Sequence, residues 1–293
     1  MRTKSNFRCD VVIFDIDNVL IDTRLSYTDC IRETVQRYLE TALKFKPSSH
    51  PLLSRQDVEN FKLLGGFNDD WDSCYGILLY LLSLKPVMKS VAALRQAKNM
   101  ASLSARIRPP LFVKGAEQRF GRKPAVFIEK IAEIFQRLYW KKYISRETPV
   151  LPPKVISALV RNGIKVAVAT GRNKREAVHG LRRAGLLHLI RRRVTLDDLP
   201  SSKFKKPNPY SLLRIADTFG RNLDYLYVGD LPDDVETANR ARRKISIRAW
   251  GFSYAAVSKE KTSRALRKAG ADRVVKAPSE LAELLLRLKP RRN

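Results

Sequence analysis

Two aspartates stand two residues apart, directly after a short apolar segment near the start of the chain. Val11–Phe14 is followed by Asp15 and Asp17. Carboxylates this close repel one another unless a cation or a proton lies between them. A hard divalent ion such as Mg²⁺ takes oxygen ligands, relieves the repulsion and binds phosphate at the same time. The pair therefore indicates a magnesium-assisted site, although aspartates at such positions also serve as turn residues and helix caps.

A second apolar segment also ends in polar residues. Lys165–Ala169 is followed by Thr170, Gly171 and Arg172. A hydroxyl group and a small residue at this position could bind a phosphate oxygen. The threonine could equally cap the helix expected to follow, and the two interpretations are compatible.

A lysine and two more aspartates occur later in the chain. Lys206 precedes Pro207, in a segment where a proline would open a helix. Asp230 follows the apolar segment 225–228 and a glycine, and Asp234 stands four positions further on. One lysine means little in a lysine-rich chain, so the lysine gains significance only together with the other motifs.

Strand and helix patterns alternate through most of the chain, which predicts a doubly wound parallel sheet. In such sheets the carboxyl ends of the strands lie at one edge, where ligands bind. The carboxylates, the hydroxyl group and the ammonium group should therefore meet there. The expected strands are 11–14, 165–169, 225–228, 245–249 and 273–275, and the expected helices are 174–184, 209–219, 233–242, 259–269 and 279–288.

Residues 23–148 interrupt this alternation and predict an inserted all-helical domain, with residues 1–22 and 149–293 forming the core. The insert follows the first strand directly, which favours a lid over the strand ends. Its part 85–124 is basic, has weaker periodicity and contains two adjacent prolines, and we expect a partly loose excursion there. The insert's expected helices are 25–43, 55–63, 71–84 and 127–143.

The order of the motifs resembles the haloacid-dehalogenase-like (HAD) superfamily: D-x-D-x-[TV], a strand-ending Ser or Thr, a Lys before Pro, and G-D-x-x-x-D. The resemblance spans residues 11–249. It implies a Rossmann-like core in which Asp15 is the nucleophile that forms an aspartyl-phosphate, and Asp17 is the general acid and then the general base. It also implies that Thr170 and Lys206 hold and neutralise the phosphoryl oxygens.

The same resemblance implies Mg²⁺ as cofactor. Its ligands would be Asp15, the backbone carbonyl of Asp17, and Asp230, with Asp234 in support near the lysine or a metal-bound water. An acid at Asp17 favours phosphate esters over carbon–halogen bonds as the target. The chain departs from the family pattern at Asn18, where glycine is common, and has a second lysine where glycine usually precedes the motif lysine.

The position of the insert resembles the helical-cap branch, subfamily I, which includes phosphoglycolate phosphatases and β-phosphoglucomutases. Segment 65–71 resembles the cap loop that reaches toward substrate in that branch. The alternative is an ordinary turn between helices, followed by a capped helix. On the first interpretation, the expected substrate-binding residues are Gly66, Asn68, Asp70, Gly171 and Arg172.

The charge of the chain is strongly positive, with 57 Lys and Arg against 29 Asp and Glu, a formal net charge of +28 and a pI near 10.3. Such a surface attracts polyanions. The basic residues fall in many small groups without a recognisable nucleic-acid motif, so a generally basic solvated surface is the simplest interpretation. Binding of nucleic acid or another anionic surface stays open as an alternative function.

The three cysteines and three histidines do not cluster, which argues against a zinc site or a disulfide framework and fits a reducing cytoplasm. The longest apolar stretch, 75–84, is too short to span a membrane.

Together with the motifs and the family resemblance, these features lead us to expect a cytoplasmic phosphatase that hydrolyses a small phosphate monoester. A phosphomutase would show the same motifs, and the sequence does not indicate the oligomeric state.

Overall fold

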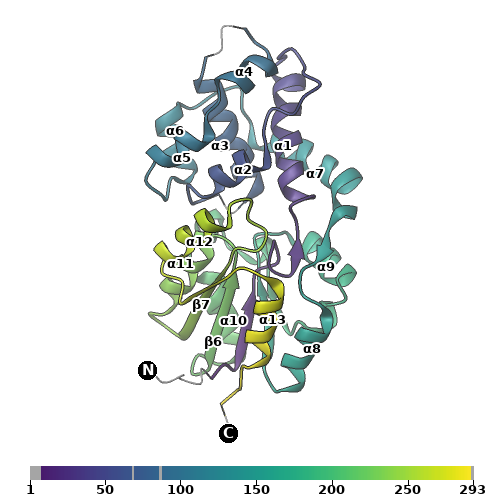
Figure 1. Ribbon diagram of the computed structural model, residues 1–293, viewed down its shortest axis with the longest axis vertical. Coiled ribbons are helices and arrows are strands. Elements are labelled where there is room, and N and C mark those ends of the chain that lie inside the picture. Colours follow the sequence, from purple (N-terminus) through teal and green to yellow (C-terminus); the bar gives the residue numbers. More distant parts are fainter. Residues whose placement is uncertain (1–7, 68, 86–87, 292–293) are drawn as a thin grey trace. The chain divides into compact units, whose positions relative to one another are not determined.

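The computed structural model describes residues 8–67, 69–85 and 88–291 (Figure 1). The chain divides into two compact units. The core unit comprises residues 1–22 and 148–293, and the insert unit comprises residues 23–147. Within the described residues, no helix is both long enough and apolar enough to cross a membrane.

The core unit contains a parallel sheet, as predicted for the doubly wound class. In the described chain the sheet has six strands, in the order β5-β4-β1-β6-β7-β8. Every neighbouring pair in it is parallel. The strands are β1 (Val11–Phe14), β4 (Lys165–Ala169), β5 (Arg192–Val194), β6 (Asp224–Gly229), β7 (Ser246–Phe252) and β8 (Arg273–Val275).

Alternate residues of the central strands pack into two separate hydrophobic cores, as the period of two in a strand requires. Val12 and Phe14 of β1 join one core, whereas Val11 and Ile13 join the other. The first core packs against α8 (Pro153–Arg161), α9 (Lys174–Arg183) and α13 (Pro278–Leu286). The second packs against α10 (Tyr210–Phe219), α11 (Pro232–Ala241) and α12 (Lys259–Lys268). Because both faces are covered, the central strand β1 is apolar and buried throughout.

A short antiparallel pair marks the place where the chain leaves and re-enters the core unit. It joins β2 (Ile21–Asp22) to β3 (Thr148–Pro149). The single-turn helices of the core unit are η4 (Leu187–Leu189), η5 (Leu196–Asp198) and η6 (Ser202–Phe204).

The insert unit is helical in its described part, and its hydrophobic core surrounds α3, which is buried on most of its circumference. Gly76 of α3 gives room for two aromatic rings, because a Cβ atom there would lie 2.8 Å from Phe61 and 2.9 Å from Phe67. The helices are α1 (Tyr27–Arg37) with its continuation η1 (Tyr38–Ala42), α2 (Arg55–Lys62), α3 (Asp70–Ser83), α4 (Val91–Ala97), α5 (Met100–Arg106), α6 (Phe112–Phe120), α7 (Ile128–Leu138) with η2 (Tyr139–Tyr143), and η3 (Ile144–Arg146).

The expectation of a loose excursion over 85–124 was wrong for the described part of that segment. It contains α4, α5 and α6, and Leu94, Met100 and Phe120 are buried in the core of the insert unit. These helices are only 7 to 9 residues long. Helices this short are stabilised mainly by tertiary packing, so their own sequence periodicity is weak.

Candidate active site

Three neighbouring strands bring the predicted reactive residues to one edge of the sheet. Phe14 of β1 is in register with Val168 of β4 and Val228 of β6. The residues that follow these strands therefore leave the sheet together. Asp15 is hydrogen-bonded to β6 through its backbone N–H, which donates to the carbonyl of Val228 at 2.9 Å.

Lys206 is buried between two of these carboxylates. Its Nζ donates to Asp15 Oδ1 at 3.0 Å and to Asp234 Oδ1 at 2.8 Å, and only 6% of its side chain is exposed. Burial alone would lower the pKa of Lys206, but Asp15 and Asp234 raise it well above its usual value. The side chain is therefore a fixed ammonium group at the strand ends, where it can neutralise an anion.

Asp234 is held by the core unit from several sides. Its Oδ1 accepts a hydrogen bond from the Tyr227 hydroxyl group at 2.9 Å, and its Oδ2 accepts one from the backbone N–H of Leu231 at 3.0 Å. The second bond caps the start of α11. A Cβ atom at Gly229 would lie 2.2 Å from the Cβ of Asp234, so only glycine fits at the end of β6.

Asp15, Asp230 and Asp234 form the cluster that could hold a metal ion. In the described part of the chain, each offers one carboxylate oxygen, and these oxygens lie within 4.8 Å of one another. Asn18 Nδ2 donates to Asp230 Oδ2 at 3.0 Å and so orients that carboxylate. An all-oxygen donor set of this kind suits Mg²⁺.

The charge of the cluster also favours a bound cation. Burial, together with Asp234 and Asp17, raises the pKa of Asp15 to about 7, although Lys206 acts in the opposite direction. The three carboxylates of the cluster carry more negative charge than the one ammonium group of Lys206 compensates. A divalent cation would compensate that excess, so the residues present fit the metal that the fold family implies.

The structure pairs Asp17 with Arg172, a residue that the resemblance predicts only as a substrate ligand. Arg172 donates to Asp17 Oδ1 from Nε at 2.9 Å and from Nη2 at 2.7 Å. The arginine side chain is 1% exposed, and that of Asp17 is 27% exposed. The carboxylate of Asp17 is not among the three carboxylates of the described metal cluster. A ligand role for its backbone carbonyl stays a prediction.

Thr170 does not cap the following helix. The N-cap of α9 is Asn173, whose side chain accepts a hydrogen bond from the backbone N–H of Glu176 at 2.9 Å. The hydroxyl oxygen of Thr170 instead accepts from the backbone N–H of Arg172 at 3.2 Å. Gly171 lies between these two residues and is exposed.

The predicted loop residues belong to the insert unit. Two of them, Gly66 and Asp70, have local structural roles within that unit. Gly66 has φ +79°, and a Cβ atom there would lie 2.2 Å from the ring of Phe112. Asp70 accepts a hydrogen bond from Lys62 Nζ at 2.6 Å. The neighbouring Asp69 caps α3, as the alternative interpretation expects. Asn68 lies outside the described residues.

Two contributors to the site were missed from sequence. Tyr227 lies on β6 two residues before Gly229, where a strand pattern alone gives no sign that its hydroxyl group reaches Asp234. Asn18 was noted only as a departure from the family. It has φ 57°, a conformation that asparagine tolerates better than most residues, and its amide holds Asp230.

Comparison with known proteins identifies the family. The model of the haloacid dehalogenase-like hydrolases matches residues 9–242. The chain therefore belongs to this family of hydrolases. A comparison with curated proteins gives no match.

Solved structures from several bacteria are similar in fold. A provisionally named phosphoglycolate phosphatase from Lactobacillus delbrueckii is 17% identical with a TM-score of 0.61, covering 95% of this chain and 99% of its own. A predicted phosphoglycolate phosphatase from Haemophilus somnus is 16% identical with a TM-score of 0.59, at 95% and 98% coverage. A family hydrolase from Deinococcus radiodurans with bound phosphate and sodium is 18% identical with a TM-score of 0.57, at 97% and 99% coverage. Identities this low demonstrate a common fold.

Proposed function

We propose that the chain is a magnesium-dependent phosphatase that hydrolyses a small phosphate monoester through an aspartyl-phosphate on Asp15. The observation that carries this proposal is the cluster of Asp15, Asp230 and Asp234, two of which, Asp15 and Asp234, bind the buried ammonium group of Lys206. Transfer of a phosphoryl group depends chiefly on positioning and on neutralising its oxygens. A lysine and a cation site beside a buried carboxylate are suited to both tasks.

In the proposed first step, a carboxylate oxygen of Asp15 attacks phosphorus, and the bond from phosphorus to the ester oxygen breaks. Asp17 gives its proton to the departing alcohol. In the second step Asp17 takes a proton from a water molecule, whose oxygen attacks phosphorus and releases phosphate from Asp15. Lys206 and Thr170 hold the phosphoryl oxygens in both steps. A bound Mg²⁺ would supply further positive charge to these oxygens.

We also propose that the insert unit selects the substrate, through Gly66, Asn68 and Asp70, with Gly171 and Arg172 contributing from the core unit. The support is the topology of the chain, because the insert interrupts the core unit after β2, only a few positions along the sequence from the residues that follow β1.

The family match gives no support to nucleic acid as partner. All three cysteines are buried thiols, and we keep the cytoplasm as the proposed location on the composition of the chain.

A panel of small phosphate esters tests the proposal directly. The panel includes phosphoglycolate, because two structural relatives carry that name. We expect inorganic phosphate to be released from at least one ester with Mg²⁺ present and not with EDTA. The matched control is Asp15→Asn, which preserves shape but cannot form the aspartyl-phosphate. Release of phosphate by that variant, or transfer within a sugar phosphate without release, would contradict the proposal.

A further inference from the structure

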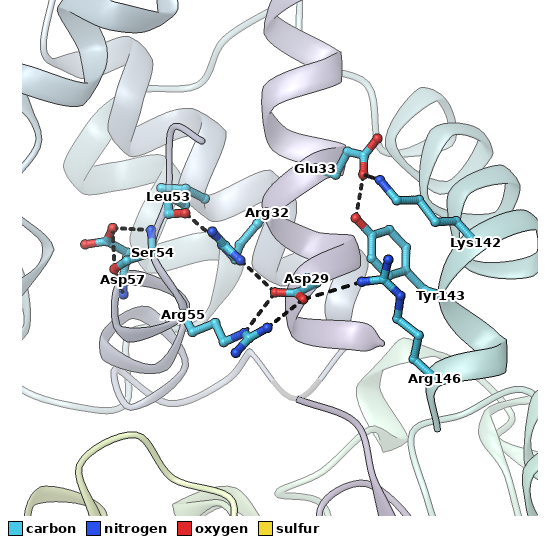
Figure 2. Close-up of polar contacts among 10 residues, drawn as sticks. All are labelled: Asp29, Arg32, Glu33, Leu53, Ser54, Arg55, Asp57, Lys142, Tyr143 and Arg146. Carbon is cyan, nitrogen blue, oxygen red and sulfur yellow. Dashed lines mark hydrogen bonds and ion pairs between the residues drawn. The ribbon is translucent and has the colours of Figure 1, made fainter. Parts of the chain in front are cut away.

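An open pocket of about 610 Å³ lies entirely within the insert unit and shares no residue with the aspartate cluster. One wall is the polar face of α1 and η1, and another is contributed by η2 (Figure 2). The volume is that of a site for a small organic molecule. Pro47, Pro51 and Tyr143 add apolar surface to a lining that is otherwise polar or charged.

The carboxylates of the pocket are already bound by side chains of the chain itself. Asp29 accepts hydrogen bonds from Arg32 Nη1 at 2.6 Å and from Arg55 Nη2 at 2.9 Å (Figure 2). Glu33 accepts from Lys142 Nζ at 2.5 Å and from the Tyr143 hydroxyl group. Because Asp29 and Glu33 are already paired with cationic side chains, they are poorly suited to bind a cation from solution.

The third carboxylate, Glu40, is bound by a neutral amide. Glu40 Oε1 accepts a hydrogen bond from Gln36 Nε2 at 2.9 Å. Burial alone would raise the pKa of Asp29, but the hydrogen bonds from Arg55 and Arg32 lower it below its usual value. Asp29 and Glu33 therefore act as internal counter-ions.

The cationic groups outnumber the carboxylates they hold. The lining itself has three carboxylates and three cationic side chains, Arg32, Arg37 and Lys142. Arg55 and Arg146 bind Asp29 from beside the pocket, so that among these described residues five cationic side chains face three carboxylates. Arg32 uses Nη1 for Asp29 and Nε for the carbonyl of Leu53 at 2.7 Å. Arg37 makes one long contact, from Nε to Glu33 at 3.6 Å. A guanidinium group has five N–H donors, so both arginines keep donors that a ligand can use.

We propose that this pocket binds a small, multiply charged oxyanion, either a di- or tricarboxylate or a phosphorylated metabolite. The excess of guanidinium and ammonium groups over carboxylates provides the attraction, and arginine presents paired donors that match both carboxylate and phosphate oxygens. The apolar wall accommodates the organic part of such a ligand. The site is independent of the function proposed for the aspartate cluster.

Titration calorimetry on the whole protein, without divalent cations, tests this site with inorganic phosphate and with citrate as separate probes. The pocket variant is Arg37→Gln with Lys142→Gln, two side chains that are 55% and 47% exposed, so folding should be preserved. The control is Arg106→Gln with Arg119→Gln, which removes the same charge from exposed positions of the insert unit outside the pocket.

We expect at least one probe to bind the wild type and the control alike, and the pocket variant about tenfold or more weakly, as for the loss of charge-assisted hydrogen bonds. The preferred probe identifies carboxylate or phosphate as the ligand chemistry. Equal weakening in both double variants would show attraction by the overall basic charge and overturn the proposal. Unchanged affinity in the pocket variant, or no binding of either probe to the wild type, would also overturn it.

Discussion

Lys206 organises the charges of the site at the level of single residues, because it holds Asp15 and Asp234 at once. The position of Asp234 is fixed further by Tyr227 and by the backbone of Leu231. Asp230 is more exposed, and one of its partners is the amide of Asn18. These surroundings suggest different tasks for two acids that the sequence motif presents as a pair: Asp230 binds metal, and Asp234 positions the lysine.

Alanine variants separate the two tasks. We expect Asp230→Ala to lower Mg²⁺ affinity by about tenfold or more with little loss of stability, since it removes one of several repelling carboxylates. Asp234→Ala should lower the affinity less but reduce the free energy of unfolding by about 3 kcal/mol, because a partner of a buried ion pair is lost. Metal titration and urea unfolding measure both quantities. A larger loss of Mg²⁺ affinity in Asp234→Ala would mean that the roles are exchanged.

At the level of elements, the strands that carry chemistry could be predicted from sequence. Val11–Phe14 and Lys165–Ala169 are short, apolar and rich in β-branched residues, as buried parallel strands are. The edge strand Arg192–Val194 was missed, because its basic residues, only partly buried at the edge, resemble a surface charge cluster. The contacts of Arg172 with Asp17 were also unpredictable, since spacing along the chain does not specify where a long side chain reaches.

The end of β6 offers a test of how closely an element positions the site. Gly229→Ala should push Asp234 away, because the new Cβ would lie 2.2 Å from that of Asp234. We expect the free energy of unfolding to fall by about 2 kcal/mol. We also expect kcat to fall to a small fraction of its wild-type value. Gly251→Ala on the neighbouring strand is the control, since its Cβ would meet the Leu266 side chain at 2.9 Å, outside the site. Comparable kcat in the two variants would contradict this positioning role.

At the level of the whole molecule, the four core motifs lie in one unit and the predicted loop lies in the other. We therefore predict that the core unit carries out the chemistry and that the insert unit selects the substrate, and substitutions in the loop of the insert unit can test this. The sequence indicated an insert from its helical patterns, but its interior was harder to predict, because α4, α5 and α6 depend on packing against the rest of that unit. The substrate-selecting role of segment 65–71 stays a prediction.

Asp70→Ala tests that role, with Lys62→Met as its control. Both variants break the ion pair between these residues, but only the first removes a carboxylate from the predicted loop. We expect Asp70→Ala to change relative kcat/KM among natural phosphate esters several-fold while hydrolysis of a small artificial ester persists, and Lys62→Met to leave the ranking unchanged. An identical change in both variants would assign the effect to the ion pair, and uniform slowing of all esters would assign it to general catalysis.

Phosphorylation of Asp15 during turnover is the central step of the proposed mechanism. The direct measurement is rapid acid quenching of the enzyme with a radiolabelled phosphate ester and Mg²⁺, followed by peptide mapping of the label. We predict label on the peptide that contains Asp15, formed and lost at rates compatible with turnover, and none in Asp15→Asn. Steady hydrolysis without a labelled peptide, or label on another residue, would contradict the proposed nucleophile and the mechanism built on it.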